Sequence, residues 1–131
     1  MSRIIYNMKT RLNIYEITSF HVDTLQGFTE PRVYNTATEI IYEGQIPHAG
    51  YLLIEGEIHF IKKRRVIQKI LPGVLFGVAE LMANIPLIFT VRILPGSKVC
   101  ILDRGTIKEI IEDMQDVESP KLPKIFYELI A

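Results

Sequence analysis

Three histidines are the first residues of this chain that could carry chemistry, because imidazole commonly binds metals. They are His21, His48 and His59. A working metal site requires three or four converging ligands. No second histidine lies two residues from His48, and none follows position 59. We therefore expect no metal site, and we interpret the three histidines as surface or turn residues.

The single cysteine, Cys100, is the other candidate for chemistry. A nucleophilic cysteine requires a positively charged, partly exposed setting that lowers the thiol pKa. Cys100 instead lies in the apolar stretch 99–102, which predicts a small buried hydrophobic residue. The chain also lacks the GxSxG, HExxH and P-loop patterns. We expect no enzymatic activity, no cofactor and no intramolecular disulfide.

The overall charge argues against two classes of partner. Fifteen Lys+Arg balance fifteen Asp+Glu, so the chain lacks the field typical of nucleic-acid and polybasic membrane binders. No run of 18 apolar residues suggests a membrane span, and the N-terminus lacks a secretory pattern, so we expect a cytoplasmic protein. The one dense charge cluster is Lys62, Lys63, Arg64 and Arg65. It is either a solvated turn or a contact patch for an acidic protein surface.

The elements that must position these residues are mainly short strands. Residues 31–103 contain runs typical of strands at 32–34, 39–42, 51–55, 57–62, 65–71, 89–93 and 98–103. Turn signals such as Gly44, Gly56 and Gly96 separate most of them. The pattern predicts an eight-stranded antiparallel β-roll of jelly-roll type. Gly56 stands between two apolar runs and predicts a tight reversal with positive φ, pairing 51–55 with 57–62.

Helical segments flank the predicted roll within one domain. Residues 1–30 form an N-terminal extension with a helix at 19–28, where Phe20, Leu25 and Phe28 share a face. The extension also holds a second apolar segment, with Ile4, Ile5, Tyr6, Leu12, Ile14 and Tyr15. Residues 104–131 comprise a helix at 104–114 and an apolar tail. That helix carries Ile107, Ile110, Ile111 and Met114 at helical spacing.

The central segments resemble the cyclic nucleotide-binding domain family. The family pattern consists of Y-x-[IL]-x-x-G-x-[VI], then L-x-x-G-x-x-F-G-E, then P-R-[ST]-A-[TS]-V. The corresponding segments here are YLLIEGEIHFI at 51–61, followed by the basic tip, ILPGVLFGVAELM at 70–82 and IPLIFTV at 85–91. The positions in register are Gly44, Tyr51, Gly56, Gly73, Phe76, Gly77, Leu81, Pro86, Thr90 and Val91. The resemblance covers roughly residues 20–114. It implies a β-roll with a short helix in the phosphate cassette.

The ligand positions depart from that family pattern. In the family, a glutamate accepts a hydrogen bond from the ribose hydroxyl, and Val78 stands at that position here. An arginine of the family pairs with the cyclic phosphate, and Leu87 replaces it. The small residues that follow are Ile88 and Phe89, and Glu80 comes two positions too late. A nucleotide that binds with a micromolar dissociation constant has a binding free energy of about −8 kcal/mol. Losing a buried charge partner costs about 2–5 kcal/mol, and losing the hydroxyl bond about 1.5–3 kcal/mol. We expect no binding of cAMP or cGMP.

The leading functional hypothesis is a non-catalytic regulatory module that binds a protein partner and serves as a signalling adaptor. The alternative is a sensor for an uncharged or apolar small molecule, in a rebuilt pocket lined by Val78, Leu87, Ile88 and Phe89. An enzyme resembling the cupins is a third class, but it would need a histidine pair that the chain lacks.

The tail suggests self-association. Ile125, Phe126, Leu129 and Ile130 fall on one face of a two-turn helix. So short a helix is unstable alone in water and must dock on its own roll, on a partner or on a second copy. We expect a homodimer in which these four residues make contacts.

Overall fold

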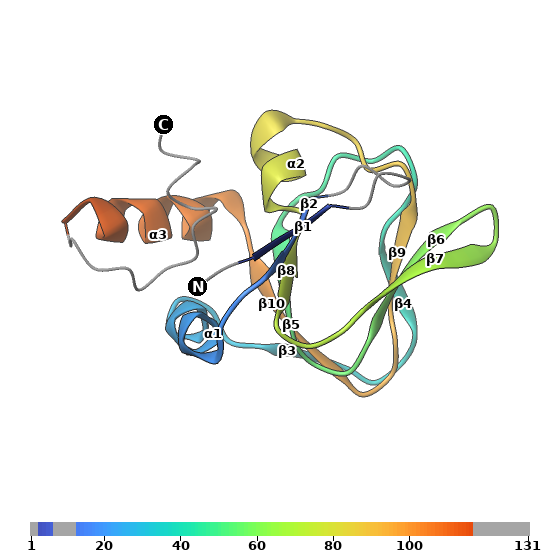
Figure 1. Cartoon of the computed structure of the whole chain (residues 1–131), viewed down its shortest axis with the longest axis horizontal. Helices are drawn as coiled ribbons and strands as arrows, with labels where there is room; N and C mark the ends of the chain where they lie inside the picture. Colours follow the sequence, from blue (N-terminus) through green and yellow to red (C-terminus); the bar gives the residue numbers. More distant parts are fainter. Residues whose placement is uncertain (1–2, 7–12, 117–131) are drawn as a thin grey trace.

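The computed structural model describes residues 3–6 and 13–116 (Figure 1). In chain order the elements are β1 (Arg3–Tyr6), β2 (Asn13–Glu16), α1 (Ser19–Gln26), β3 (Arg32–Tyr34), β4 (Thr38–Ile41), β5 (Gly50–Glu55), β6 (Ile58–Lys62), β7 (Arg65–Ile70), β8 (Val74–Phe76), α2 (Val78–Ala83), β9 (Thr90–Ile93), β10 (Ser97–Leu102) and α3 (Arg104–Asp116).

Two antiparallel sheets make up the β-structure of the described residues. The larger has the strand order β1-β2-β8-β5-β10-β3, and the smaller has the order β4-β9-β6-β7. Strands β3 to β10 form the eight-stranded roll that the sequence predicts, so the fold class is confirmed. The N-terminal hairpin β1–β2 extends the larger sheet by pairing with β8, and neither this hairpin nor the three-residue β8 was predicted.

The predicted pairing across Gly56 is wrong. Strand β5 pairs with β8 and β10 in one sheet, whereas β6 pairs with β7 and β9 in the other. Gly56 does adopt the expected positive φ of 95°. The chain therefore uses this glycine to pass from one sheet to the other. A Cβ at Gly56 would lie 2.6 Å from the Cα of Ser97, which is closer than any side chain tolerates.

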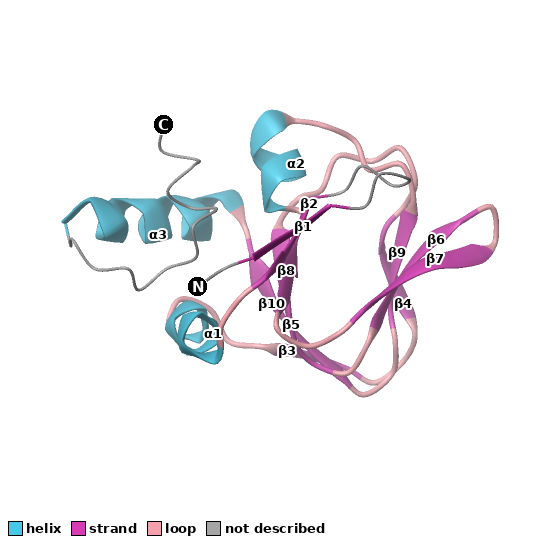
Figure 2. Cartoon of the chain, viewed as in Figure 1, coloured by secondary structure: helices cyan, strands magenta, loops and turns pink. Residues whose placement is uncertain are grey.

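Two apolar clusters hold the layers together. One fills the space between the sheets, and it includes Leu53, Phe60, Phe76 and Phe89. The other lies on the outer face of the larger sheet, where α1, α2 and α3 gather on one side of the molecule (Figure 2). Strand alternation explains the division, because Leu52 and Leu53 are neighbours in β5 and join different clusters.

The flanking helices confirm part of the predicted pattern. Helix α3 begins where predicted, and Ile107 and Ile110 are buried. Helix α1 begins after Thr18, whose hydroxyl accepts a hydrogen bond from the backbone N–H of His21. The predicted apolar face of α1 is wrong at Phe20, which is 57% exposed. His21 lies on the inner side instead, so its interpretation as a surface residue is also wrong.

We predict that Gly56→Ala destabilises the fold more than Gly96→Ala. Both glycines have positive φ, and alanine costs about 1–2 kcal/mol in that conformation. The methyl group at position 96 would meet open space, whereas at position 56 it would meet Ser97 and cost a further ~1–3 kcal/mol. Urea unfolding of both variants measures the difference. Equal losses of stability would contradict the close approach at Gly56.

Candidate functional site

The segment that corresponds to the phosphate cassette is fixed by backbone geometry. Gly77 precedes α2 with φ 85°, and Asn84 ends the helix with φ 57°. The Arg104 guanidinium closes the helix end, since its Nη2 donates to the Leu81 carbonyl at 2.7 Å and to Asn84 Oδ1 at 2.8 Å. This arginine therefore fastens the cassette to the start of α3.

The loop after α2 is anchored to the segment between β4 and β5. The Leu87 N–H donates to the Gln45 carbonyl at 2.9 Å, and the Leu87 carbonyl accepts from the Gly44 N–H at 2.7 Å. These bonds hold the backbone of Leu87 on both sides. The Leu87 side chain is 2% exposed and belongs to the cluster between the sheets. An apolar buried side chain therefore occupies the position where the family resemblance expects a phosphate-binding arginine.

Aromatic rings occupy the interior of the roll beside this loop. Phe89 stacks on Phe60 with ring centroids 4.9 Å apart and an interplanar angle of 21°. Phe60 in turn meets Phe76 edge-on at 5.2 Å. Tyr51 stacks on Phe76 at 5.5 Å. Through these contacts the four rings form one continuous row. Phe60, Phe76 and Phe89 expose no surface, so the row lies inside the core.

The structure brings together only two of the four residues assigned to the nucleotide positions. Leu87 and Phe89 share the cluster between the sheets, whereas Val78 belongs to the cluster beneath the helices. Val78 packs against Gly50 so closely that a Cβ there would lie 2.3 Å from Val78 Cγ2. Ile88 is 40% exposed. Glu80 is buried in α2.

Sequence reasoning overlooked the partners of Phe89 inside the roll. The signal was present in the period-2 alternation of β6, which places Ile58 and Phe60 on the same face. It could not show that Phe60 would meet Phe89, because β6 and β9 become neighbours only through sheet pairing. Tyr51 belongs to the same interior, and burial, followed by the nearby Tyr34, raises its pKa to about 12. Its phenol is therefore neutral at physiological pH.

Cys100 is a small buried residue, which confirms the prediction from the sequence. Its side chain exposes no surface, and burial raises the pKa of the thiol to about 11. The thiolate needed for nucleophilic attack is therefore scarce at neutral pH. Among the described residues, no group of three His, Cys, Asp or Glu side chains could hold a metal ion.

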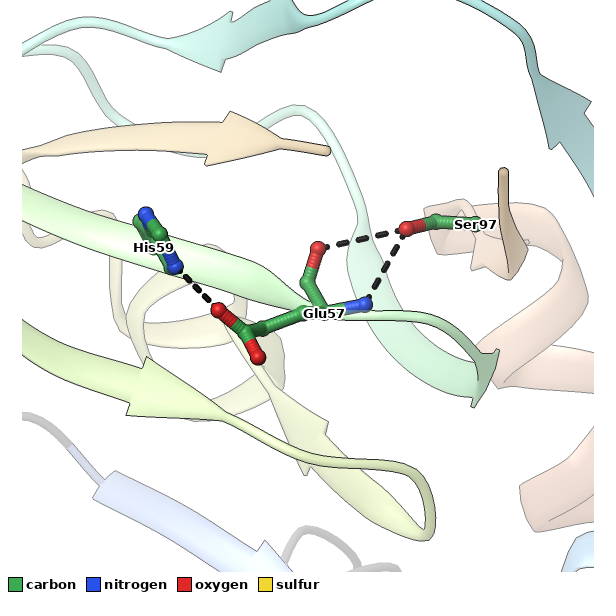
Figure 3. A network of polar contacts seen from close by, with 3 residues as sticks. All are labelled: Glu57, His59 and Ser97. Atoms are coloured by element: carbon green, nitrogen blue, oxygen red, sulfur yellow. Dashed lines mark hydrogen bonds and ion pairs between the residues drawn. The ribbon is translucent and has the colours of Figure 1, made fainter. Parts of the chain in front are cut away.

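A serine, a histidine and a glutamate do meet near the sheet crossing (Figure 3). The His59 ring contacts the Glu57 carboxylate. The Ser97 hydroxyl, however, bonds the Glu57 backbone, accepting from its N–H at 3.1 Å and donating to its carbonyl at 3.2 Å. Ser97 is fully buried. These contacts assign Ser97 to the crossing at Gly56 rather than to attack on a substrate.

A surface hollow of about 540 Å³ lies between the loop before β5, α2 and the start of α3. Its lining includes His48, Leu81 and Asp103. The Asp103 carboxylate accepts a hydrogen bond from the Thr106 N–H at 2.8 Å, which holds the pKa of that carboxyl below its ordinary value. Asp103 therefore acts as the N-terminal cap of α3.

Comparison with known proteins agrees with this geometry. Residues 31–114 match the family model of the cyclic nucleotide-binding domain, and the chain belongs to that family. The potassium channel KAT3 of Arabidopsis thaliana is 31% identical over 85 residues, which make up 62% of this chain and 13% of the channel.

Solved structures share this fold. The catabolite activator protein of Thermus thermophilus superposes with a TM-score of 0.61 at 21% identity, over 75% of this chain and 48% of that protein. The second cyclic nucleotide-binding domain of a protein kinase A regulatory subunit, bound to Sp-2Cl-cAMPS, gives a TM-score of 0.59 at 25% identity, over 77% of this chain and 69% of the other. No helix in the described part of the chain is long and apolar enough to cross a membrane.

We predict that Phe89→Ala lowers the free energy of unfolding by about 3–5 kcal/mol, because it removes a fully buried ring from a packed row. The matched control is Ile88→Ala at the adjacent, 40% exposed position, where a loss below about 1 kcal/mol is expected. Chemical denaturation measures both. A Phe89→Ala protein as stable as the control would show that the ring is not part of the core.

Proposed function

We propose that this domain is a non-catalytic regulatory module that binds a protein partner in cytoplasmic signalling and does not bind cAMP or cGMP. The stacking of Phe89 on Phe60 carries the proposal. Both rings are fully buried, and Phe89 stands where the family resemblance expects a small residue beside the cyclic phosphate. A nucleotide entering there would have to displace a packed ring from the core.

Electrostatics support the same conclusion. A cyclic phosphate keeps its charge when it binds, and an unpaired charge in an apolar interior is very costly. Leu87 offers no charge and no hydrogen bond at the family's arginine position. The regulatory role is supported by the relatives, which include a domain of a kinase regulatory subunit and part of an ion channel.

The alternative, a sensor for an apolar small molecule, has less support. It requires Val78, Leu87, Ile88 and Phe89 to line one cavity, yet Val78 and the pair Leu87 and Phe89 pack in different clusters. The space between the sheets beside Phe89 is occupied by other rings.

We predict that cAMP or cGMP at about 1 mM leaves the melting temperature unchanged. A ligand at 100 times its Kd would add about 2.7 kcal/mol to the stability, which raises the melting temperature of a domain of this size by several degrees. Differential scanning fluorimetry measures the shift. A cyclic nucleotide-binding domain that retains the arginine and glutamate serves as the positive control. A shift of several degrees in this protein would contradict the proposal.

We also propose that the tail makes a homodimer through Ile125, Phe126, Leu129 and Ile130, which lie outside the described residues. We expect the full chain to sediment as a dimer at about 100 μM, because an isolated two-turn helix must bury its apolar face. A chain ending at Ser119 should sediment as a monomer. A monomeric full chain would contradict the dimer, and a dimer that survives truncation would contradict the role of the tail.

A further inference from the structure

Strand β7 is the outer strand of the smaller sheet. Within the described part of the chain it pairs on one side with β6, and it ends the order β4-β9-β6-β7. Residues 65–67 and 69 of this strand are exposed, and only Ile70 is buried. In Figure 1 the β6–β7 hairpin projects beyond the rest of the roll. Its outer edge therefore offers backbone groups that another strand could pair with.

The tip of this hairpin is a tight two-residue turn. Lys62 pairs with Arg65, and the residues between them, Lys63 and Arg64, have φ of 51° and 63°. Positive φ at both central positions defines the turn that matches the twist of a hairpin. The Lys62 ammonium donates to the Ile88 carbonyl at 3.0 Å. These features hold the tip in one orientation against the cassette loop.

Apolar side chains accompany the charges along the edge. Val66 is 45% exposed and Ile67 is 37% exposed. Arg65 and Ile67 line a hollow of about 480 Å³, while Val66 and Arg64 line another of about 390 Å³. Successive side chains of a strand point to opposite faces. Residues 65 and 67 therefore line one hollow, and residue 66 lines the other. The hollow at Arg65 and Ile67 joins an apolar side chain to cations, which suits a partner strand that alternates acidic and apolar residues. The hollow at Val66 also contains the carboxylates of Glu39 and Glu43.

The positive charges of the hairpin are available to a binding partner. Among the described residues, Lys63, Arg64 and Arg65 form no ion pair. The nearby Glu39 already pairs with Arg92, since its Oε1 accepts two hydrogen bonds from the Arg92 guanidinium, at 2.7 and 3.0 Å. In a chain with zero net charge, this hairpin is thus a local concentration of cations.

We propose that the edge of β7 binds an extended acidic peptide segment of a partner protein, which adds to the smaller sheet as an antiparallel fifth strand. Backbone pairing would give affinity, while Arg65 and Lys69 would select acidic side chains. The same cations disfavour edge-to-edge pairing of β7 with a second copy, because like charges would then face each other. This inference rests on the proposed function, and it specifies the surface and the chemistry of the partner.

The test uses the full chain and a fluorescein-labelled peptide of alternating Glu and Val, about six to eight residues long, the length of a strand. We expect saturable binding by fluorescence anisotropy that weakens as salt rises. Hydrogen exchange should show new protection of the β7 amides and none in the edge strand β3. The same peptide with every Glu replaced by Lys should not bind.

Charge-reversal variants test the cations. Arg65→Glu with Lys69→Glu should weaken peptide binding by about tenfold or more. The control, Arg32→Glu with Lys108→Glu, changes the net charge equally at exposed positions outside β7 and should bind within about twofold of the parent. Equal weakening by both variants would overturn the proposal, since it would show a non-specific charge effect.

Other outcomes would also overturn it. Peptide binding without protection of β7 would show that no strand is added. Tighter association with phosphatidylserine vesicles or a single-stranded oligonucleotide would assign the hairpin to another class of ligand. The nucleotide titration separates this inference from the proposed function. A thermal shift with cAMP would refute the closed interior and leave the peptide result intact, whereas absence of peptide binding without such a shift would refute only this inference.

Discussion

The packing of Phe89 against Phe60 is the contact on which the rest of the account depends. It joins β6 to the residue before β9, and through Phe76 and Tyr51 it continues to the larger sheet. The row of rings thereby links both layers of the roll. Phe60, Phe76 and Phe89 are fully buried, so the row contributes to the packing of the core.

The proposed function places recognition on the outer surfaces of the molecule. The three helices cover the outer face of the larger sheet, where Val78, Leu81 and Ile107 bury their side chains. In the part of the chain that the structure describes, β7 ends the smaller sheet, and its neighbouring cations Lys63, Arg64 and Arg65 form no ion pair. Arg104 joins α2 to the start of α3, and Lys62 joins the β6–β7 hairpin to the loop after α2. Most residues of β7 are exposed, so its edge presents backbone groups and positive charge to the surroundings.

The sequence predicted the parts of this structure that depend on local pattern. The boundaries of most strands, the start of α3, the positive φ of Gly56 and the burial of Cys100 follow from alternation, helical spacing and turn chemistry. The pairing of β5 with β8 and β10 did not follow. A glycine with positive φ marks a change of direction, but it does not determine whether the next strand stays in the same sheet.

The candidate site shows the same limit. The family resemblance placed Val78, Leu87, Ile88 and Phe89 at the nucleotide positions, yet their surroundings depend on contacts between distant segments. Val78 turns toward Gly50, while Phe89 meets Phe60 across a sheet pairing. In α1 the error at Phe20 arose because so short a helix has few turns to define its buried face, and His21 lies there.

The central claim, that aromatic rings close the interior to nucleotides, is tested most directly by nuclear magnetic resonance on the full chain. The backbone amide signals of Phe60, Phe76 and Phe89 would be followed while cAMP is added to about 10 mM, well above a millimolar dissociation constant. We expect these three signals to stay in place. Saturable movement of all three would contradict it, because it would place the nucleotide inside the roll.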